Sequence, residues 1–258
     1  MPMVRPMPLR MFCRRIFLAA LLTGFAAAEA PPASARPVVV ELFTSQGCSS
    51  CPPADKLLTE LAGRPDVIAL SLPITYWDML GWKDTLASEA NTRRQKAYAQ
   101  ALGRRGIYTP QVIVDGTIDV VGSRRQEVLD AIAARSSAER ANVPVTVANT
   151  PDEVRIGIAG LRTHKGDDAT IWMLHTLSRI EVAVVRGENE GRKLSYSNVV
   201  RDLKAVGTWR GEAVTLDLPK RFMASAEHDG LVVLVQQGGH GPILGAAMIG
   251  VPGYRPGR

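Results

Sequence analysis

The chain has 258 residues, of which 46% are hydrophobic and 22% charged, and its formal net charge is +6. This length provides one large domain or two ordinary ones, with enough chain to bury a substantial core. The hydrophobic share excludes wholesale disorder, and the 23 glycines and 17 prolines follow no collagen-like period.

The N-terminal segment has the pattern of a secretory signal peptide. Arginines precede an apolar run from Ile16 to Ala28, which small residues and prolines follow. The run is short for a membrane helix, so a retained anchor is the lesser alternative. We expect residues 1–35 to be removed, which predicts a periplasmic or secreted protein that is not an integral membrane protein. Arg14-Arg15 fits either a twin-arginine export signal or an ordinary basic region.

Charge argues against a nucleic-acid partner. Removal of residues 1–35 would take away four arginines and one glutamate and leave a net charge of +3. The remaining basic residues are scattered and are not interleaved with aromatic side chains, unlike those of a nucleic-acid-binding surface.

Two cysteines remain after processing, in the segment Gly47-Cys48-Ser49-Ser50-Cys51-Pro52. In an oxidising compartment such a pair forms a disulfide, but the loop it closes is too short to stabilise the fold strongly. The pair lies between a β-branched strand, residues 38–43, and the start of a helix near Pro52. Unpaired N–H groups at a helix start favour a thiolate, so we predict Cys48 as nucleophile and Cys51 as resolving cysteine.

Strands and helices alternate over the next 85 or so residues, as periodicity and turn residues indicate. The predicted elements are a helix up to Gly63, a strand at 67–75, a helix at 87–103, strands at 110–114 and 117–121, and a helix at 125–135. Asp115-Gly116 predicts a tight hairpin turn between the last two strands.

This order resembles the thioredoxin superfamily over residues 38–135, together with the Cys-x-x-Cys pair and Thr109-Pro110. More closely, the chain resembles a bacterial family of exported thioredoxin-like proteins with no established function. The motifs that carry this resemblance are residues 41–55, 76–78, 81–84, 186–189 and 198–201. The resemblance implies an α/β thioredoxin-like N-terminal domain, residues 36–140, and thiol–disulfide chemistry without a named substrate.

The resemblance also implies roles for residues outside the cysteine pair. Pro110 would have a cis peptide bond beside the disulfide, and Thr109 would present its backbone to a substrate. Glu41 lies near the position of a buried acid that would deprotonate Cys51 through water; its alternative role is an ion pair at a strand edge. Ser49-Ser50 replaces the usual Gly-Pro, which predicts a moderate potential and leaves the direction of electron flow open.

Other side chains near the pair have two interpretations each. Tyr76, Trp77 and Trp82 could wall a substrate pocket beside the cysteines, or they could pack into the core of an inserted turn. Asp55, in the first turn after Cys51, is interpreted as charge compensation at the helix start.

After residue 140 the pattern predicts mainly strands. They are expected at residues 143–147, 154–158, 169–177, 180–185, 213–218, 231–237 and 244–249. Such spacing is typical of a sandwich-like β domain, residues 141–258, although the strands could instead dock onto the first sheet. The four histidines are isolated in sequence, so no metal site is predicted.

Three functions remain open. The favoured hypothesis is an exported thiol–disulfide oxidoreductase that needs no cofactor beyond the Cys48–Cys51 disulfide. Its partners would be exported thiol or disulfide proteins, or a membrane electron donor. The second is a non-enzymatic protein that binds or delivers copper or zinc through the two thiolates. The third is a binding protein whose disulfide is inert.

Overall fold

The computed structural model describes Met1, Met3 and residues 36–138, 141–150, 152–161, 166–219 and 228–250. The predicted signal peptide lies outside these residues, apart from its first and third methionines. Residues Ala35–Arg258 form one compact unit, which contains all the assigned helices and strands.

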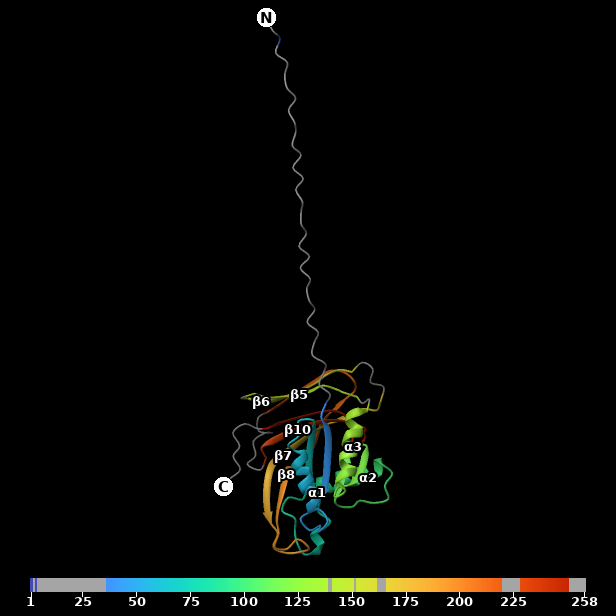
Figure 1. Ribbon diagram of the computed structural model, residues 1–258, viewed down its shortest axis with the longest axis vertical. Coiled ribbons are helices and arrows are strands. Elements are labelled where there is room, and N and C mark those ends of the chain that lie inside the picture. Colours follow the sequence, from blue (N-terminus) through green and yellow to red (C-terminus); the bar gives the residue numbers. More distant parts are fainter. Residues whose placement is uncertain are drawn as a thin grey trace. The chain divides into compact units, whose positions relative to one another are not determined.

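An eight-stranded mixed sheet dominates this unit, in the order β11-β10-β7-β8-β2-β1-β3-β4 (Figure 1). Its strands are β1 (Val38–Thr44), β2 (Val67–Pro73), β3 (Gln111–Val114), β4 (Ile118–Val121), β7 (Ala169–Ala183), β8 (Lys193–Trp209), β10 (Gly230–Gln237) and β11 (Ile243–Gly250). β2 pairs in parallel with both β1 and β8, and the other neighbours are antiparallel. The predicted hairpin turn is confirmed, because Asp115 and Gly116 join β3 to β4 with φ of 52° and 72°.

Helices cover both faces of the first half of this sheet. They are α1 (Pro52–Leu61), α2 (Glu89–Ala101), α3 (Arg125–Ser137) and the short 3-10 helix η1 (Asp78–Leu80). Val40 and Leu42 of β1 pack with α1 and α3, whereas Val39 and Phe43 pack with Tyr98 of α2. Alternate residues of a strand point to opposite faces, so β1 serves two cores and is buried throughout.

The far end of the sheet curls back over the α2 face. Val232 and Leu234 of β10 belong to the same core cluster as Val39 and Phe43 of β1. The turn after β10 also meets the β3–β4 turn, where a side chain at Gly116 would lie only 2.2 Å from the Gly241 carbonyl oxygen. This close approach requires a glycine at position 116.

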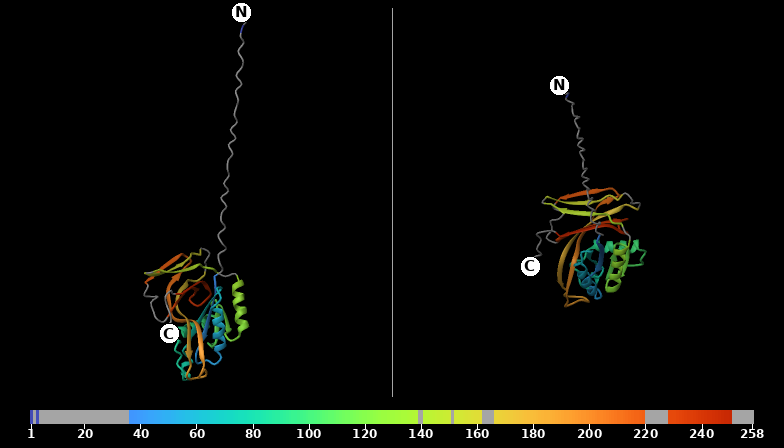
Figure 2. Two further views of the ribbon diagram at one scale, coloured as in Figure 1. Left: turned by 60° about the vertical axis from the view of Figure 1, so that its left-hand side comes forward. Right: turned by 45° about the horizontal axis from the view of Figure 1, so that its top comes forward.

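A separate three-stranded sheet covers the outer face of the curled end (Figure 2, right). Its strands are β5 (Val145–Asn149), β6 (Glu153–Ile158) and β9 (Val214–Pro219), in the order β5-β6-β9. Val154 and Ile156 of β6 share a core cluster with Ile171 of β7 and Val233 of β10. Because β10 alternates between the two cores, almost all of its residues are buried.

The fold class expected from the sequence is wrong. An α/β thioredoxin-like domain followed by a sandwich-like β region would have two independent sheets. Instead, β7, β8, β10 and β11 extend the sheet formed by β1 to β4 into one eight-stranded sheet, and strand outweighs helix among the described residues. Of the arrangements open from sequence, the later strands follow the one in which they dock onto the first sheet.

The joint between the two halves of the sheet is β8, a strand that the sequence pattern does not predict. Val199 pairs with Ser71 of β2. The neighbouring Asn198 has φ of 47° and donates from Nδ2 to the Ala69 carbonyl oxygen at 2.9 Å. Arg201 donates from Nη1 to the Leu86 carbonyl oxygen at 3.2 Å. The motif at residues 198–201 therefore holds the two halves together.

Candidate functional site

A disulfide joins Cys48 and Cys51 in the turn between β1 and α1, with Cα atoms 5.4 Å apart. Both cysteines are 0% exposed, whereas Ser49 and Ser50 between them are exposed. The Cys48 sulfur lies 3.4 Å from the Ser50 hydroxyl oxygen. The predicted pair is therefore formed, but solvent does not reach either sulfur.

The start of α1 offers fewer free N–H groups than the sequence pattern alone suggests. Pro52 and Pro53 occupy the first two helical positions, and proline has no N–H. The next two N–H groups, of Ala54 and Asp55, both donate to the Cys51 carbonyl oxygen. A Cys48 thiolate would therefore depend on the Ser50 hydroxyl and the helix dipole.

The segment from residue 76 to 85 holds the loop that precedes the disulfide. Trp82 donates from Nε1 to Oε1 of Gln46 at 2.9 Å, and Asp84 accepts from the Gln46 N–H at 2.8 Å. Trp77 lies against Gly47, where an added Cβ would be 3.2 Å from the Trp77 Cβ. Two of the three predicted pocket aromatics thus support the backbone of the cysteine loop.

Thr109 and Pro110 are linked to this loop through Trp77. The Thr109–Pro110 peptide bond is cis, as the resemblance implies. Trp77 donates from Nε1 to the Thr109 hydroxyl at 2.8 Å. Tyr76, whose ring lies 6.4 Å from that of Trp77, is half-buried, and burial raises its pKa. Tyr76, Trp77 and Thr109-Pro110 are therefore brought together, while Trp82 contacts the cysteine loop separately through Gln46.

Glu41 does not lie where a proton exchange with Cys51 would need it. Its carboxylate accepts from Arg94 Nε at 2.6 Å and from the Tyr98 hydroxyl, on the α2 face of the sheet. Gln236 of β10 completes the cluster by accepting from Arg94 at 3.0 Å. Because α1 and Cys51 belong to the opposite face, Glu41 is not placed to act on Cys51. It forms an ion pair, as the alternative interpretation expects, but the pair is buried inside the protein and does not lie at a strand edge.

Asp55 is the buried acid on the α1 face, a role that its position at the helix start did not predict. Its Oδ1 accepts from the Thr44 hydroxyl at 2.8 Å, while Oδ2 is buried without a hydrogen-bond partner. Burial raises its pKa to about 8, with a smaller contribution from the negative charge of Asp84. Asp55 follows Cys51 by four residues and precedes Leu58 by three, so it lies on the apolar stripe of α1. That spacing is the signal that could have predicted its burial.

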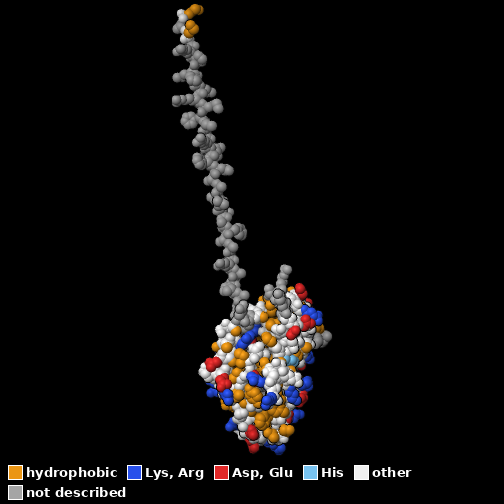
Figure 3. Space-filling view, turned by 90° about the vertical axis from the view of Figure 1, so that its right-hand side faces the viewer, with side chains coloured by type: hydrophobic (Ala, Val, Ile, Leu, Met, Phe, Trp, Pro, Cys, Tyr) orange, Lys and Arg blue, Asp and Glu red, His pale blue; other side chains and the backbone are white. Residues whose placement is uncertain are grey.

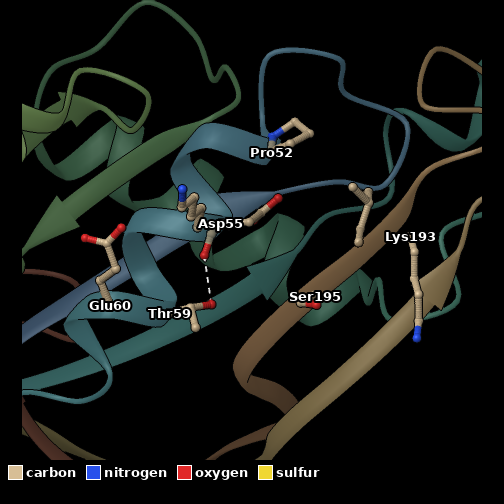
Figure 4. A pocket seen from close by; sticks show the side chains of 8 residues that line it. Pro52, Asp55, Thr59, Glu60, Lys193 and Ser195 are labelled. Atoms are coloured by element: carbon tan, nitrogen blue, oxygen red, sulfur yellow. Dashed lines mark hydrogen bonds between the residues drawn. The ribbon is translucent and has the colours of Figure 1, made fainter.

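A pocket of about 370 Å³ opens beside Asp55, between α1 and β8 (Figure 4). It is lined by Pro52, Asp55, Lys56, Thr59, Glu60, Lys193, Leu194 and Ser195. Tyr196 of β8 lies close enough for the charges of Asp55 and Asp84 to raise its pKa further, although burial is the main cause. The strand β8 thus supplies one wall of the environment that keeps Asp55 protonated at neutral pH.

The loop between β7 and β8 also contacts the cysteine loop. Asn189 is 0% exposed and donates from Nδ2 to the carbonyl oxygens of Gln46 and Cys48, each at 2.9 Å. Glu188 accepts from the Ser49 N–H at 3.1 Å. Three motifs that are far apart in sequence, at residues 76–78, 81–84 and 186–189, therefore converge on the cysteine loop.

Residues 39–236 match the family DUF1223, which is described as a protein of unknown function. The chain belongs to DUF1223. The DUF1223 match extends from β1 into β10, so it includes the cysteine loop and all the segments that contact it. No curated protein matches the chain.

Two solved structures are similar to this DUF1223 chain. A crystal structure of a protein from Agrobacterium tumefaciens is 36% identical, with a TM-score of 0.75, and the match covers 88% of this chain and 99% of that one. The protein HBP35 of Porphyromonas gingivalis is 13% identical, with a TM-score of 0.57, over 86% of this chain and 77% of that one. The second likeness shows the fold alone.

Neither a metal cluster nor a membrane-spanning helix is found in the described part of the chain. No three His, Cys, Asp or Glu residues there lie close enough together to hold a metal ion. No helix among those residues is long and apolar enough to cross a membrane.

Proposed function

We propose that this DUF1223 protein is an exported thiol–disulfide oxidoreductase that exchanges the Cys48–Cys51 disulfide with thiol or disulfide partners. The observation that carries the proposal is the buried carboxyl of Asp55, one helical turn from Cys51, whose Oδ2 has no hydrogen-bond partner. Buried polar atoms are normally hydrogen-bonded, so an unpaired acid with a strongly raised pKa marks a functional site more often than a structural one. A bridge that only stabilised the fold would not need such a neighbour.

The chemistry follows from the positions of the three groups. A partner thiolate attacks Cys48 Sγ, the Cys48–Cys51 bond breaks, and its electron pair goes to Cys51 Sγ. Asp55 then gives its proton from Oδ2 to the Cys51 sulfur, directly or through one water, because residues four apart on a helix are neighbours.

The second half of the reaction releases the partner. A second partner thiol attacks the mixed disulfide at the partner's sulfur, and Cys48 leaves as a thiolate beside the Ser50 hydroxyl. Two electrons pass from the partner to the protein, so the partner thiols are oxidised to a disulfide, and the reverse sequence reduces a partner disulfide. Because both Asp55 and Cys51 are buried, the proton stays within the protein during the exchange.

The reduction potential of the Cys48–Cys51 pair tests the proposal. The protein, after removal of residues 1–35, is equilibrated in glutathione buffers and its thiols are trapped with a mass tag. We expect a potential between about −120 and −270 mV, the range of exchange catalysts. A potential below about −300 mV would identify an inert structural bridge and overturn the proposal. A pair that does not form a disulfide in these buffers would favour metal binding instead.

A further inference from the structure

The burial of the disulfide conflicts with any reaction that begins by attack on Cys48 Sγ. In-line attack by a thiolate requires access to the sulfur, and Cys48 is 0% exposed. Two segments contact the cysteine loop around it, the one that includes η1 and the loop between β7 and β8. The β7–β8 loop is held to the cysteine loop by hydrogen bonds that a partner could replace.

The β7–β8 loop is attached to the cysteine loop through a few hydrogen bonds. Asn189 Nδ2 supplies two of them, to the Gln46 and Cys48 carbonyl oxygens. Arg192 fixes the Asn189 amide by donating from Nη1 to its Oδ1 at 3.0 Å. Glu188 accepts from the Ser49 N–H, and hydrogen bonding from the Ser49 side chain, followed by its N–H, lowers the pKa of Glu188.

The contact made by Asn189 is buried, but several hydrophobic side chains of the η1 segment and the β7–β8 loop are exposed. Among the described residues after Met3, the large hydrophobic side chains with high exposure are Met79, Leu80 and Val185. All three belong to these two segments, and hydrophobic side chains also gather towards the lower end of the molecule in Figure 3. The β7–β8 loop is therefore not buried as a whole, and Asn189 is the buried side chain that holds it to the cysteine loop.

We propose that Asn189 and Glu188 are specificity-determining residues, which hold the β7–β8 loop over the disulfide and decide which thiols reach Cys48. The inference rests on the proposed function. The backbone groups that the loop occupies are two carbonyl oxygens and one N–H. A polypeptide partner that supplies two donors and one acceptor replaces these bonds and gains access, whereas a bulky thiol without such groups does not.

The test is the rate at which thiols reduce the disulfide of the folded protein. Dithiothreitol attacks Cys48 Sγ, Cys51 leaves as a thiolate, and the second thiol closes the reagent into its cyclic disulfide with transfer of two electrons. In Asn189→Asp the donors are lost while the shape is kept, and we expect reduction at least tenfold faster. That change corresponds to about 1.4 kcal/mol in the opening equilibrium. The matched control on the same loop, Glu190→Gln, should react like the parent protein.

Three further variants, at two other positions of the loop, test the proposal if Asn189→Asp is poorly folded. Arg192→Met frees the Asn189 amide without touching the cysteine loop and should give a smaller acceleration. Glu188→Gln retains an acceptor for Ser49, whereas Glu188→Ala does not, so only the alanine variant should react faster. Reduction through local opening depends little on urea, whereas reduction through global unfolding has the full urea dependence.

The ratio of the rates with a small and a bulky thiol shows whether a faster reaction comes from opening of the β7–β8 loop or from a general loss of stability. The parent protein should react much faster with 2-mercaptoethanol than with a thiol-terminated polyethylene glycol. Asn189→Asp should reduce that ratio at least about fivefold without a new urea dependence. Equal rates and equal ratios in the parent and Asn189→Asp would overturn the inference, even with a potential in the catalytic range. A potential below about −300 mV together with faster reduction of Asn189→Asp would overturn the proposed function and leave the cover established.

Discussion

Glu41 and Asp55 are buried on opposite faces of the β1–β2 sheet, and these two acids differ in their partners. On the α2 face, Glu41 is paired with Arg94 and hydrogen-bonded to Tyr98. On the α1 face, Asp55 has only the Thr44 hydroxyl and keeps one oxygen unpartnered. Burial of a charge is tolerated when it is paired, and otherwise the group takes up a proton. Glu41 therefore forms a buried ion pair, whereas burial raises the pKa of Asp55 and favours its protonated form.

Breaking the Glu41 cluster should produce the largest loss of stability. Arg94→Met removes the cation and leaves a buried carboxylate, so we expect the free energy of unfolding to fall by about 3–5 kcal/mol. Urea denaturation monitored by tryptophan fluorescence measures it. The exposed neighbour Arg93 gives the control Arg93→Met, which should change stability by less than about 0.5 kcal/mol. If Arg94→Met were as stable as this control, the cluster would not be a closed ion pair.

The contribution of Asp55 to folding stability should change with pH in the opposite direction to that of an ordinary paired acid. Its folded pKa of about 8 lies above the ordinary aspartate value of 3.8, so the folded state binds the extra proton and stability falls as pH rises between these values. From pH 5.5 to 7.5 the parent protein should lose about 2–3 kcal/mol more than Asp55→Asn, because one pKa unit corresponds to about 1.4 kcal/mol. Denaturation curves at several pH values measure this difference.

Two controls limit the interpretation of the Asp55 experiment. Glu190→Gln replaces an exposed acid and should follow the parent protein at every pH. The thiol–disulfide exchange rate of Asp55→Asn should also lose its dependence on a group that titrates near pH 8. Parallel stability curves for Asp55→Asn and the parent protein would show that Asp55 is ionised in the folded state, contrary to the comparison of the two faces.

Of the substitutions at Arg94, Asp55 and Asn198, the one at Asn198 should have the smallest effect on folding stability. Asn198→Ala loses the hydrogen bond to Ala69 and replaces asparagine, which tolerates a positive φ, by alanine, which rarely adopts one; the two effects should cost about 1–3 kcal/mol. Asn198→Gly loses the same bond but tolerates the φ, so it should be about 1 kcal/mol more stable than the alanine variant. Thermal unfolding of both variants measures the two contributions. Equal losses would show that the backbone conformation at 198 contributes nothing.

Local patterns were sufficient for most elements of the first half of the chain. The β-branched run at 38–43, the Asp115-Gly116 turn and the helical spacing of Leu57, Leu58 and Leu61 each depend on neighbours in sequence, and the structure contains all of them. The cysteine pair is recognisable for the same reason. The strand β8 was not predictable in this way, because its charged residues and Asn198 interrupt the alternation that a strand normally shows.

What the sequence alone determined was the local chemistry: a Cys-x-x-Cys pair before a proline-started helix, and a set of short motifs around it. The tertiary structure decided which acid serves which partner and what contacts the cysteine loop. Those outcomes depend on contacts between residues more than 100 positions apart, such as Asn189 with Cys48 and Gln236 with Arg94. Burial and pairing are properties of the packed molecule, so two acids that look alike in sequence become an ion pair and a proton donor only after folding.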